Sequence, residues 1–449
     1  MAQVGSAQRP LRVAIVGSGP SGFYTAAALL QSGIQLQIDL LDRLPTPFGL
    51  VRGGVAPDHQ KIKGVVRAYN KTAQMPGFRF LGNVTVGVDV SLQRLLEAYD
   101  QVVLAVGASS SRKLHIEGEE LPGSHAATDF VGWYNGHPDH QHHDFDLSCS
   151  VAVVVGVGNV AMDVTRILAQ DPARLTQTDI TDAALDELRD SKITDIYVLG
   201  RRGPAQAAFS PAEIRELDEI EGVDLIVRPE DAALDPCSAA WLEEHGDKRA
   251  QQNVAFLQEV AQRQGTAPRR VHLRLRTSPI AYRGPDRVRQ VELGRNVLEC
   301  HDGEPTARDT GEREQLDAGL VLRAVGYRGV RLPGAPFDER RGIIPNRAGQ
   351  VIDGEAVVPR LFVVGWAKRG PKGLIGTNRA DAKETVEHML AALPGLDPTP
   401  RDALSFDGAV SWDGWERLDA LELAEGEQRG KIRQKFLEID AMLGALEDA

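Results

Sequence analysis

Two glycine-rich segments carry the residues of this chain whose types and spacing are best suited to chemistry. The first reads GSGPSG and contains Gly17, Gly19 and Gly22; the second reads GVGNVA and contains Gly156 and Gly158; each follows an apolar run. In such a motif the first glycine permits a tight turn, the second lets the backbone approach a pyrophosphate, and the third position allows close helix packing. Together the motifs predict one enzyme that holds two dinucleotides and passes electrons between them.

The elements expected around the first motif complete a dinucleotide site. An apolar strand over residues 12–16 enters the turn, and a helix over residues 23–31 leaves it with free N–H groups directed at the phosphates. A second strand over residues 37–41 ends at Asp42, about 20 residues after the last glycine, where an acid meets the ribose hydroxyls. A carboxylate there disfavours a 2′-phosphate, so the motif predicts FAD or NAD rather than NADP.

The second motif leads to basic rather than acidic residues. A helix over residues 159–169 is followed by a polar insertion, a strand over residues 193–199, and then Arg201 and Arg202. Guanidinium groups form bidentate bonds to phosphate oxygens, and an arginine at this place accommodates the 2′-phosphate of NADP. The insertion makes the spacing longer than usual, so solvated charges at a strand end remain the alternative. We expect NADPH as the second dinucleotide.

Composition places the chain among acidic globular proteins. The formal net charge is −12, 25% of the residues are charged and 42% are hydrophobic, and 449 residues suffice for two or three domains. No apolar run reaches the roughly 18 residues that a membrane-spanning helix needs, and nothing indicates nucleic-acid binding. Residues 1–10 contain no apolar signal segment, which predicts a cytoplasmic protein.

The three cysteines offer no sequence motif. Cys149, Cys237 and Cys300 are far apart in the chain and form no CxxC pair. This spacing argues against a redox disulfide and against a zinc or iron–sulfur centre ligated by cysteine. It agrees with a reducing cytoplasm.

The apolar stretches predict how the two dinucleotide units are arranged along the chain. Residues 100–108 and 319–327 resemble each other and flank the second motif, which indicates one domain inserted into another. A third apolar stretch, residues 360–366, returns to the first domain, and a helix begins near Arg379 after a glycine-rich turn. A proline-rich linker over residues 394–400 leads to a C-terminal helical appendage.

The predicted fold is therefore α/β with two Rossmann-like dinucleotide-binding domains, the NADP domain inserted into the FAD domain. The FAD domain comprises residues 1–109 and 329–449, and the NADP domain comprises residues 110–328.

Several further segments resemble the adrenodoxin reductase family of NADPH–ferredoxin reductases. The resemblance runs from about Val13 to the C-terminal part, in family order, through residues 17–24, 47–59, 130–135, 158–164, 200–209, 365–371 and 410–412. Small departures are Ser21 in place of the usual alanine, Gln60 in place of proline after His59, and Ala205 in place of leucine. We expect that Gln60 loosens the loop that positions His59.

The resemblance implies a role for individual residues. The positions that match FAD contacts are Ser21, Asp42, Leu50, Val86, Trp366, Gly373, Leu374 and Ile375. The positions that match the surroundings of NADP are Gly156, Gly158, Asn159, Val160, Arg201, Arg202, Glu213 and again Gly373. His59 and Glu216 match polar residues beside the meeting point of flavin and nicotinamide, which makes them the candidate catalytic pair.

The resemblance also implies an activity and a partner. NADPH delivers a hydride to FAD, and single electrons pass to an iron–sulfur ferredoxin. An acidic ferredoxin would suit the locally basic face of the middle domain, which contains Arg215, Lys248, Arg249, Arg263, Arg269, Arg270, Arg274 and Arg276. Two alternatives stay open: a flavin dehydrogenase with a small-molecule acceptor, and a non-catalytic flavoprotein that senses NADPH.

One histidine-rich loop lies outside this interpretation. His137, His140, His142 and His143 occur in a loop rich in proline and aspartate, with irregular spacing. The family resemblance offers no metal there, so we predict no native metal site. Whether the loop binds any metal stays open.

Overall fold

The structure is a computed structural model that describes residues 3–447, and the chain divides into two compact units. Unit 1 extends to Ser110 and resumes at Tyr327; unit 2 spans Ser111–Gly326. The chain passes between them along two short strands, β5 (Ser110–Ser111) and β15 (Tyr327–Arg328), which pair with each other. No helix within residues 3–447 is both long enough and apolar enough to cross a membrane.

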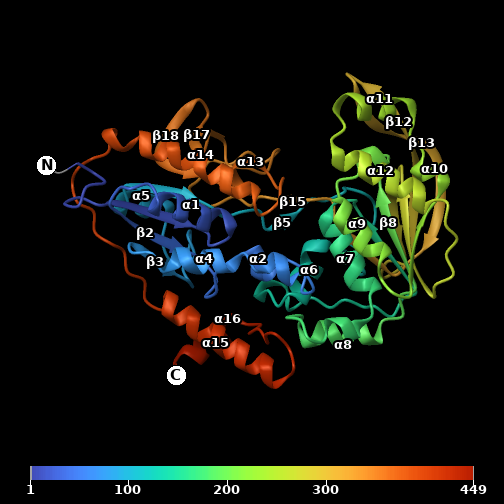
Figure 1. Cartoon of the computed structure of the whole chain (residues 1–449), viewed down its shortest axis with the longest axis horizontal. Coiled ribbons are helices and arrows are strands. Elements are labelled where there is room, and N and C mark those ends of the chain that lie inside the picture. The colour runs from blue at the N-terminus through green and yellow to red at the C-terminus, as the bar shows by residue number, and fades with distance from the viewer. Residues whose placement is uncertain (1–2, 448–449) are drawn as a thin grey trace. The chain divides into compact units, whose positions relative to one another are not determined.

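Unit 1 contains a seven-stranded sheet with helices, and Figure 1 labels several of these elements. Its first part consists of β1 (Leu11–Val16), α1 (Pro20–Leu30), β2 (Leu36–Leu41), α2 (Leu50–Gly53), α3 (Gln60–Lys63), α4 (Val66–Ala73), β3 (Phe78–Leu81), α5 (Leu92–Ala98) and β4 (Gln101–Leu104). Its second part consists of β16 (Asn346–Arg347), β17 (Gln350–Asp353), β18 (Ala356–Val363), α13 (Trp366–Arg369), α14 (Thr377–Ala391), a short 3₁₀ turn (Leu393–Gly395), α15 (Trp412–Gln428) and α16 (Ile439–Glu447).

The sheet of unit 1 places β1 at its centre. The strand order is β16-β17-β18-β4-β1-β2-β3, and the five strands from β18 to β3 are parallel. Val16, the last residue of β1, pairs with Leu41 on one side and Leu104 on the other. The chain thus turns to opposite sides of the sheet around β1, and ligands of open α/β sheets bind at such a point, outside the carboxyl ends of the strands.

The helix after the first glycine motif begins earlier than predicted. Helix α1 starts at Pro20 rather than Phe23, because proline at the first helical position has the required φ and no N–H to leave unpaired. Ser21 and Gly22 therefore lie in the first helical turn. Helix α1 packs beside α14 from the far end of the chain.

The C-terminal helices are part of the core of unit 1. Trp415 and Leu418 of α15 are buried with Phe48 and with residues of β1, β2 and α1. Trp412 lies 6.3 Å from Phe23 between ring centroids, in an edge-on arrangement. The segment predicted as an appendage thus contributes apolar packing to the FAD-type fold.

Unit 2 contains a six-stranded parallel sheet and a three-stranded antiparallel sheet. Its elements are β6 (Ser124–Ala126), α6 (Ala127–Tyr134), η1 (Pro138–His140), β7 (Val151–Val155), α7 (Asn159–Ala169), η2 (Pro172–Leu175), α8 (Asp182–Asp190), β8 (Asp195–Gly200), η3 (Pro204–Gln206), α9 (Pro211–Asp218), β9 (Val223–Val227), α10 (Pro229–Ala232), α11 (Pro236–His245), α12 (Lys248–Val260), β10 (Arg269–Leu275), β11 (Thr277–Arg283), β12 (Gln290–His301), β13 (Glu304–Asp317) and β14 (Leu320–Arg323).

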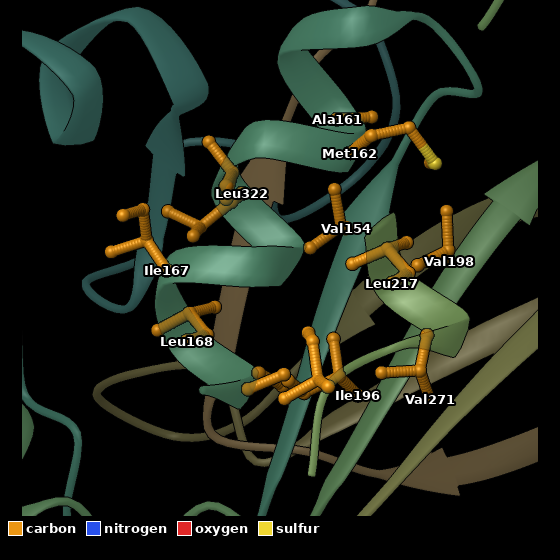
Figure 2. Packing of buried hydrophobic residues seen from close by; sticks show 14 of the residues in the cluster. Val154, Ala161, Met162, Ile167, Leu168, Ile196, Val198, Leu217, Val271 and Leu322 are labelled. Atoms are coloured by element: carbon orange, nitrogen blue, oxygen red, sulfur yellow. The ribbon is translucent and has the colours of Figure 1, made fainter. Parts of the chain in front are cut away.

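The parallel sheet of unit 2, in the order β6-β14-β7-β8-β10-β9, is buried under α7 and its neighbours. Figure 2 shows Ala161, Met162 and Ile167 of α7 directed at the apolar side chains of the strands, among them Val154. Every third or fourth residue of α7 is apolar, which supplies the buried stripe. This packing holds the start of α7 at the carboxyl end of β7.

Two cysteines form a pair that their spacing in the sequence does not indicate. Cys237 in α11 and Cys300 in β12 form a disulfide although they are 63 residues apart, with their Cα atoms 5.7 Å from each other. Helix α11 packs on β12, so distance along the chain does not limit their approach. Cys149 is the one free cysteine among residues 3–447, and it is half-buried.

Candidate functional site

The turn after β1 is shaped to receive a pyrophosphate. Gly17 has φ +107°, and a Cβ there would lie 2.5 Å from the carbonyl oxygen of Ala105, so only glycine fits. A Cβ at Gly22 would lie 2.1 Å from the carbonyl oxygen of Gly17, which explains the third glycine. A Cβ at Gly19 would meet nothing within 4 Å. Gly19 thus faces open space at the N-terminus of α1, where a pyrophosphate can approach the protein backbone.

Asp42 lies beside this turn, directly after β2. Its Oδ2 accepts hydrogen bonds from the N–H of Ser18 (2.9 Å) and the Ser18 hydroxyl (2.5 Å), and its Oδ1 accepts from the N–H of Leu44 (3.0 Å). These are three of roughly four bonds that a carboxylate accepts. The carboxylate is therefore held in place next to the glycine turn, with acceptor capacity left for a ribose hydroxyl.

Three predicted FAD positions lie around the same turn. Helix α2 starts at Leu50 after Gly49, where an added Cβ would lie 3.1 Å from the Cα of Gly19. Val86 is buried in one cluster with the last residues of β1 and β2. Ser21 is buried in α1, and a Cβ added at Gly365 would lie 2.3 Å from its hydroxyl oxygen. Segments more than 300 residues apart are thus brought together.

Trp366 provides an unused hydrogen-bond donor at this place. It starts α13 directly after Gly365, and its buried indole Nε1 has no hydrogen-bond partner among residues 3–447. Buried donors are almost always satisfied, so an orphaned one marks a place for a ligand. Next along the chain, Gly373 has φ +83°, Leu374 is 68% exposed, and Ile375 packs on the core at the start of α14. The unpaired indole N–H and the open space at Gly19 fit FAD.

His59 caps the short helix α3 in unit 1. Its carbonyl accepts from the N–H groups of Ile62 (3.0 Å) and Lys63 (3.2 Å), and its ring is half-buried. The expectation that Gln60 loosens this loop stays a prediction. The Gln60 side-chain amide donates to the carbonyl of Pro57 at 2.7 Å, which links two residues of the loop.

The second glycine turn, in unit 2, repeats the geometry of the first. Gly156 has φ +131°, and a Cβ there would lie 2.3 Å from the carbonyl oxygen of Ala324, whereas a Cβ at Gly158 would meet nothing within 4 Å. Asn159 begins α7 as predicted, and its Oδ1 accepts from the N–H of Ser210 at 2.9 Å. Val160 is half-buried against the core. Asn159 thereby connects this turn to α9.

Helix α9 presents the two predicted glutamates one turn apart. Ser210 caps the helix and accepts from the N–H of Glu213 at 3.3 Å. The buried guanidinium of Arg166 in α7 lies 3.4 Å from Glu213 and 3.5 Å from Glu216. Glu213 is buried and Glu216 is half-buried. His59 belongs to unit 1 and Glu216 belongs to unit 2.

Arg201 and Arg202 follow β8 and line a hollow of about 380 Å³. Within the part of the chain that the structure describes, neither guanidinium lies within 4 Å of a carboxylate. Partial burial and the adjacent charge of Arg201 lower the pKa of Arg202. Two unpaired cations beside each other repel, and a bound phosphate would relieve that repulsion.

The other walls of this hollow were not predicted. They come from β11, β12 and β13, and include Ser278, Asn296, Thr306 and Asp309. Buried Asn296 donates through Nδ2 to the carbonyl of Arg201 at 3.0 Å and to the hydroxyl of Ser278 at 2.8 Å. It thus fixes the backbone that carries the arginine pair. No motif marks Asn296, because its role depends on strands that meet β8 only in the folded unit.

The predicted basic face is partly neutralised. Arg263 pairs with Asp218 (2.8 Å) and Glu259 (2.6 Å). Arg270 pairs with Asp195, Arg274 pairs with Glu314, and Arg269 donates to the carbonyl of Ala169. Arg215 and Lys248 remain exposed, on α9 and α12. Fewer charges are therefore available to a partner than the sequence indicates.

Comparison with known proteins identifies the family of the chain. The pyridine nucleotide-disulphide oxidoreductase family matches residues 11–199. The NADPH-ferredoxin reductase FprA of Mycobacterium tuberculosis is 46% identical, over 97% of this chain and 99% of the relative. The mitochondrial NADPH:adrenodoxin oxidoreductase of Bos taurus is 40% identical, over 97% and 92%. The chain belongs to the adrenodoxin reductase-type family of NADPH–ferredoxin reductases.

A solved structure agrees with this membership in the NADPH–ferredoxin reductase family. Mycobacterium tuberculosis FprA in complex with NADPH matches the chain with a TM-score of 0.91 and 44% identity, covering 98% of this chain and 100% of that one. The family resemblance, the α/β fold with two Rossmann-like units and the oxidoreductase class are confirmed.

Proposed function

We propose that this chain oxidises NADPH and delivers single electrons to an iron–sulfur ferredoxin, with FAD held by unit 1 and NADPH by unit 2. The observation that carries the proposal is the unpaired pair Arg201 and Arg202 in its hollow, beside a second glycine turn. Bound FAD supplies the step from a two-electron donor to a one-electron acceptor. The names of the relatives support the same donor and acceptor.

The residues of unit 1 bind and orient the flavin nucleotide. Gly19 and the first turn of α1 provide N–H groups for the pyrophosphate, and Asp42 accepts from the ribose. The free Nε1–H of Trp366 donates to the cofactor. Ser21, Leu50, Val86 and residues 373–375 surround the same place. In unit 2, Gly158 and Asn159 receive the pyrophosphate of NADPH, and Arg201 and Arg202 receive the 2′-phosphate.

His59 and Glu216 orient the nicotinamide and supply protons, without forming an obligate acid–base pair. His59→Ala is therefore expected to slow flavin reduction by NADPH in stopped-flow measurements while the protein keeps its FAD. Loss of FAD from the variant would instead assign His59 to folding or cofactor retention.

The docking face for an acidic ferredoxin contains Arg215 and Lys248. Arg215→Glu and Lys248→Glu are expected to raise the KM for ferredoxin several-fold at low salt, and the effect fades at high salt because such charges are screened. Lys71→Glu, an exposed lysine of α4, is the control. An equal effect of the control would place docking elsewhere. The cytoplasmic location stays a prediction.

The nucleotide preference tests the assignment of unit 2. A hydrogen bond to a charged group is worth about 1.5–3 kcal/mol, so Arg201→Ala or Arg202→Ala should raise the KM for NADPH by roughly 10- to 150-fold and change the KM for NADH little. Arg308→Ala is the matched control. Arg308 lies in β13, on the hairpin that walls the hollow, between the lining residues Ala307 and Asp309, and its guanidinium pairs with Glu299. An equal rise in the KM for NADPH and for NADH would refute the assignment of Arg201 and Arg202 to the 2′-phosphate.

The acceptor is tested by NADPH-driven reduction of cytochrome c with a panel of iron–sulfur ferredoxins. Strong stimulation by one ferredoxin is the expected result. Flavin reduction without stimulation by any of them would favour a small-molecule acceptor, and absence of turnover would favour an NADPH sensor.

A further inference from the structure

Three side chains of unit 2 meet in an arrangement that the nucleotide chemistry does not use. Asp129 lies in the first turn of α6, His140 ends η1, and His143 follows in the same loop. One ligand atom of each lies within 4.8 Å of the others, and Nδ1 of His140 is 3.5 Å from Oδ1 of Asp129. Although the sequence predicts no native metal in this loop, we infer that Asp129, His140 and His143 form a binding site for a divalent transition-metal ion of the zinc type.

The backbone around these side chains fixes the site. A Cβ added at Gly132 would lie 2.1 Å from Cδ2 of His140, so the imidazole lies directly against α6 at a position where only glycine leaves room. The amide of Gln141 donates to the carbonyls of Trp133 (3.2 Å) and His137 (3.0 Å). The loop is thereby fastened to the end of α6, and little ordering remains to be done by a metal.

The imidazoles are suited to act as ligands. Among residues 3–447 the buried Nδ1 of His140 has no hydrogen-bond partner, and it faces Oδ1 of Asp129 at 3.5 Å. Burial lowers the pKa of His140 and of His143, although Asp129 acts in the opposite direction on both. A neutral imidazole nitrogen is the atom that binds a metal, and both rings offer one to the site.

The spacing and the donor types select the class of metal. Zinc–nitrogen bonds of about 2.0–2.1 Å in a tetrahedron place ligand atoms roughly 3.3 Å apart, close to the separation of His140 and Asp129. Two imidazoles and one carboxylate suit Zn²⁺, Co²⁺, Ni²⁺ or Cu²⁺, whereas Mg²⁺ prefers oxygen ligands. Three protein ligands leave one position for water. The metal would link α6 to the loop that follows it, independently of the nucleotide sites.

The test is a titration of the tag-free, FAD-loaded protein with Zn²⁺, followed by calorimetry, and with Co²⁺, followed by its visible ligand-field bands beyond the flavin absorption. We expect one equivalent per chain and no comparable binding of Mg²⁺. Asp129→Asn, His140→Ala and His143→Ala should each weaken binding at least tenfold. Flavin content and the melting temperature without metal verify that each variant is folded.

His142→Ala is the matched control, because His142 is an exposed neighbour in the same loop and lies outside the three-atom group. It should bind Zn²⁺ as the unmodified protein does. The inference is overturned if His142→Ala loses binding as strongly as His140→Ala, if Asp129→Asn binds unchanged, or if Zn²⁺ and Mg²⁺ bind alike. Each of these outcomes would mean that Asp129, His140 and His143 form no metal site, or that the histidine-rich loop chelates metals unspecifically.

Discussion

Glu422 is the residue whose replacement we expect to weaken unit 1 most clearly. It is fully buried in α15, and its carboxylate accepts from Arg52 (2.8 and 2.5 Å), from Arg433 (2.7 Å) and from the N–H of Phe436 (3.0 Å). Arg52 follows Leu50 in α2, at the proposed FAD site. Helix α15 thus anchors the segment that we propose to hold the cofactor.

The expected magnitude follows from the burial of this group. Breaking a buried ion pair by removing one partner costs about 3–5 kcal/mol, since the other charge is left uncompensated. Unit 1 has about 230 residues and therefore an unfolding entropy of about 0.5 kcal/mol/K. Glu422→Gln should accordingly lower the melting temperature of unit 1 by roughly 6–10 °C.

The stabilisation by Glu422 depends on pH as expected of a carboxylate whose pKa is lowered by folding. Burial by itself raises the pKa of Glu422, but the charges and hydrogen bonds of Arg52 and Arg433 outweigh it and lower the pKa below its usual value. The contribution of the Glu422 carboxylate to the free energy of unfolding is thus fully present above the pKa of the unfolded state, about 4.3. It is lost as the pH falls through the pKa of the folded state. The melting-temperature difference should be constant from about pH 5.5 to 8 and shrink below about pH 4.3.

The assay is scanning calorimetry of the FAD-loaded protein together with the fluorescence of released flavin. Glu427→Gln, an exposed glutamate of the same helix, controls for helix propensity. A shift for Glu422→Gln no larger than that of the control, about 1 °C, would refute the reasoning. So would a difference that grows on acidification below pH 4.

Three further predictions concern the glycine turn, the disulfide and the arginine pair. Gly19→Ala should fold and should lose FAD affinity in equilibrium titration, because a Cβ at Gly19 has open space. Gly17→Ala should not yield a stable unit 1, because a Cβ at Gly17 would collide with the backbone of Ala105. Equal behaviour of the two variants would contradict this. Mass spectrometry under non-reducing conditions should find Cys237 joined to Cys300, and reduction should destabilise unit 2 by up to about 4 kcal/mol for a loop of this length; two free thiols at these positions would disprove the pairing. Asn296→Ala should raise the KM for NADPH roughly five-fold, since it removes a hydrogen bond worth about 1 kcal/mol to the carbonyl of Arg201. An unchanged KM would show that the backbone at Arg201 keeps its position without this hydrogen bond.

The sequence alone determined those features that depend on neighbours in the chain. The glycine turns, the strands that precede them, the helix that begins at Asn159 and the arginines after β8 all follow from turn chemistry and apolar periodicity. Such signals reach only a few residues along the chain. For this reason the two-unit α/β fold and the nucleotide motifs could be predicted without a structure.

Only the tertiary structure decided which distant residues meet. The disulfide joins residues 63 positions apart, the Glu422 carboxylate binds Arg52 across 370 positions, and Asn296 fixes the backbone of Arg201 across 95. Asp129 joins His140 and His143 because Gly132 admits an imidazole against α6. Each contact depends on how sheets and helices pack, and that packing is a sum over the whole core which no local pattern of residue types contains.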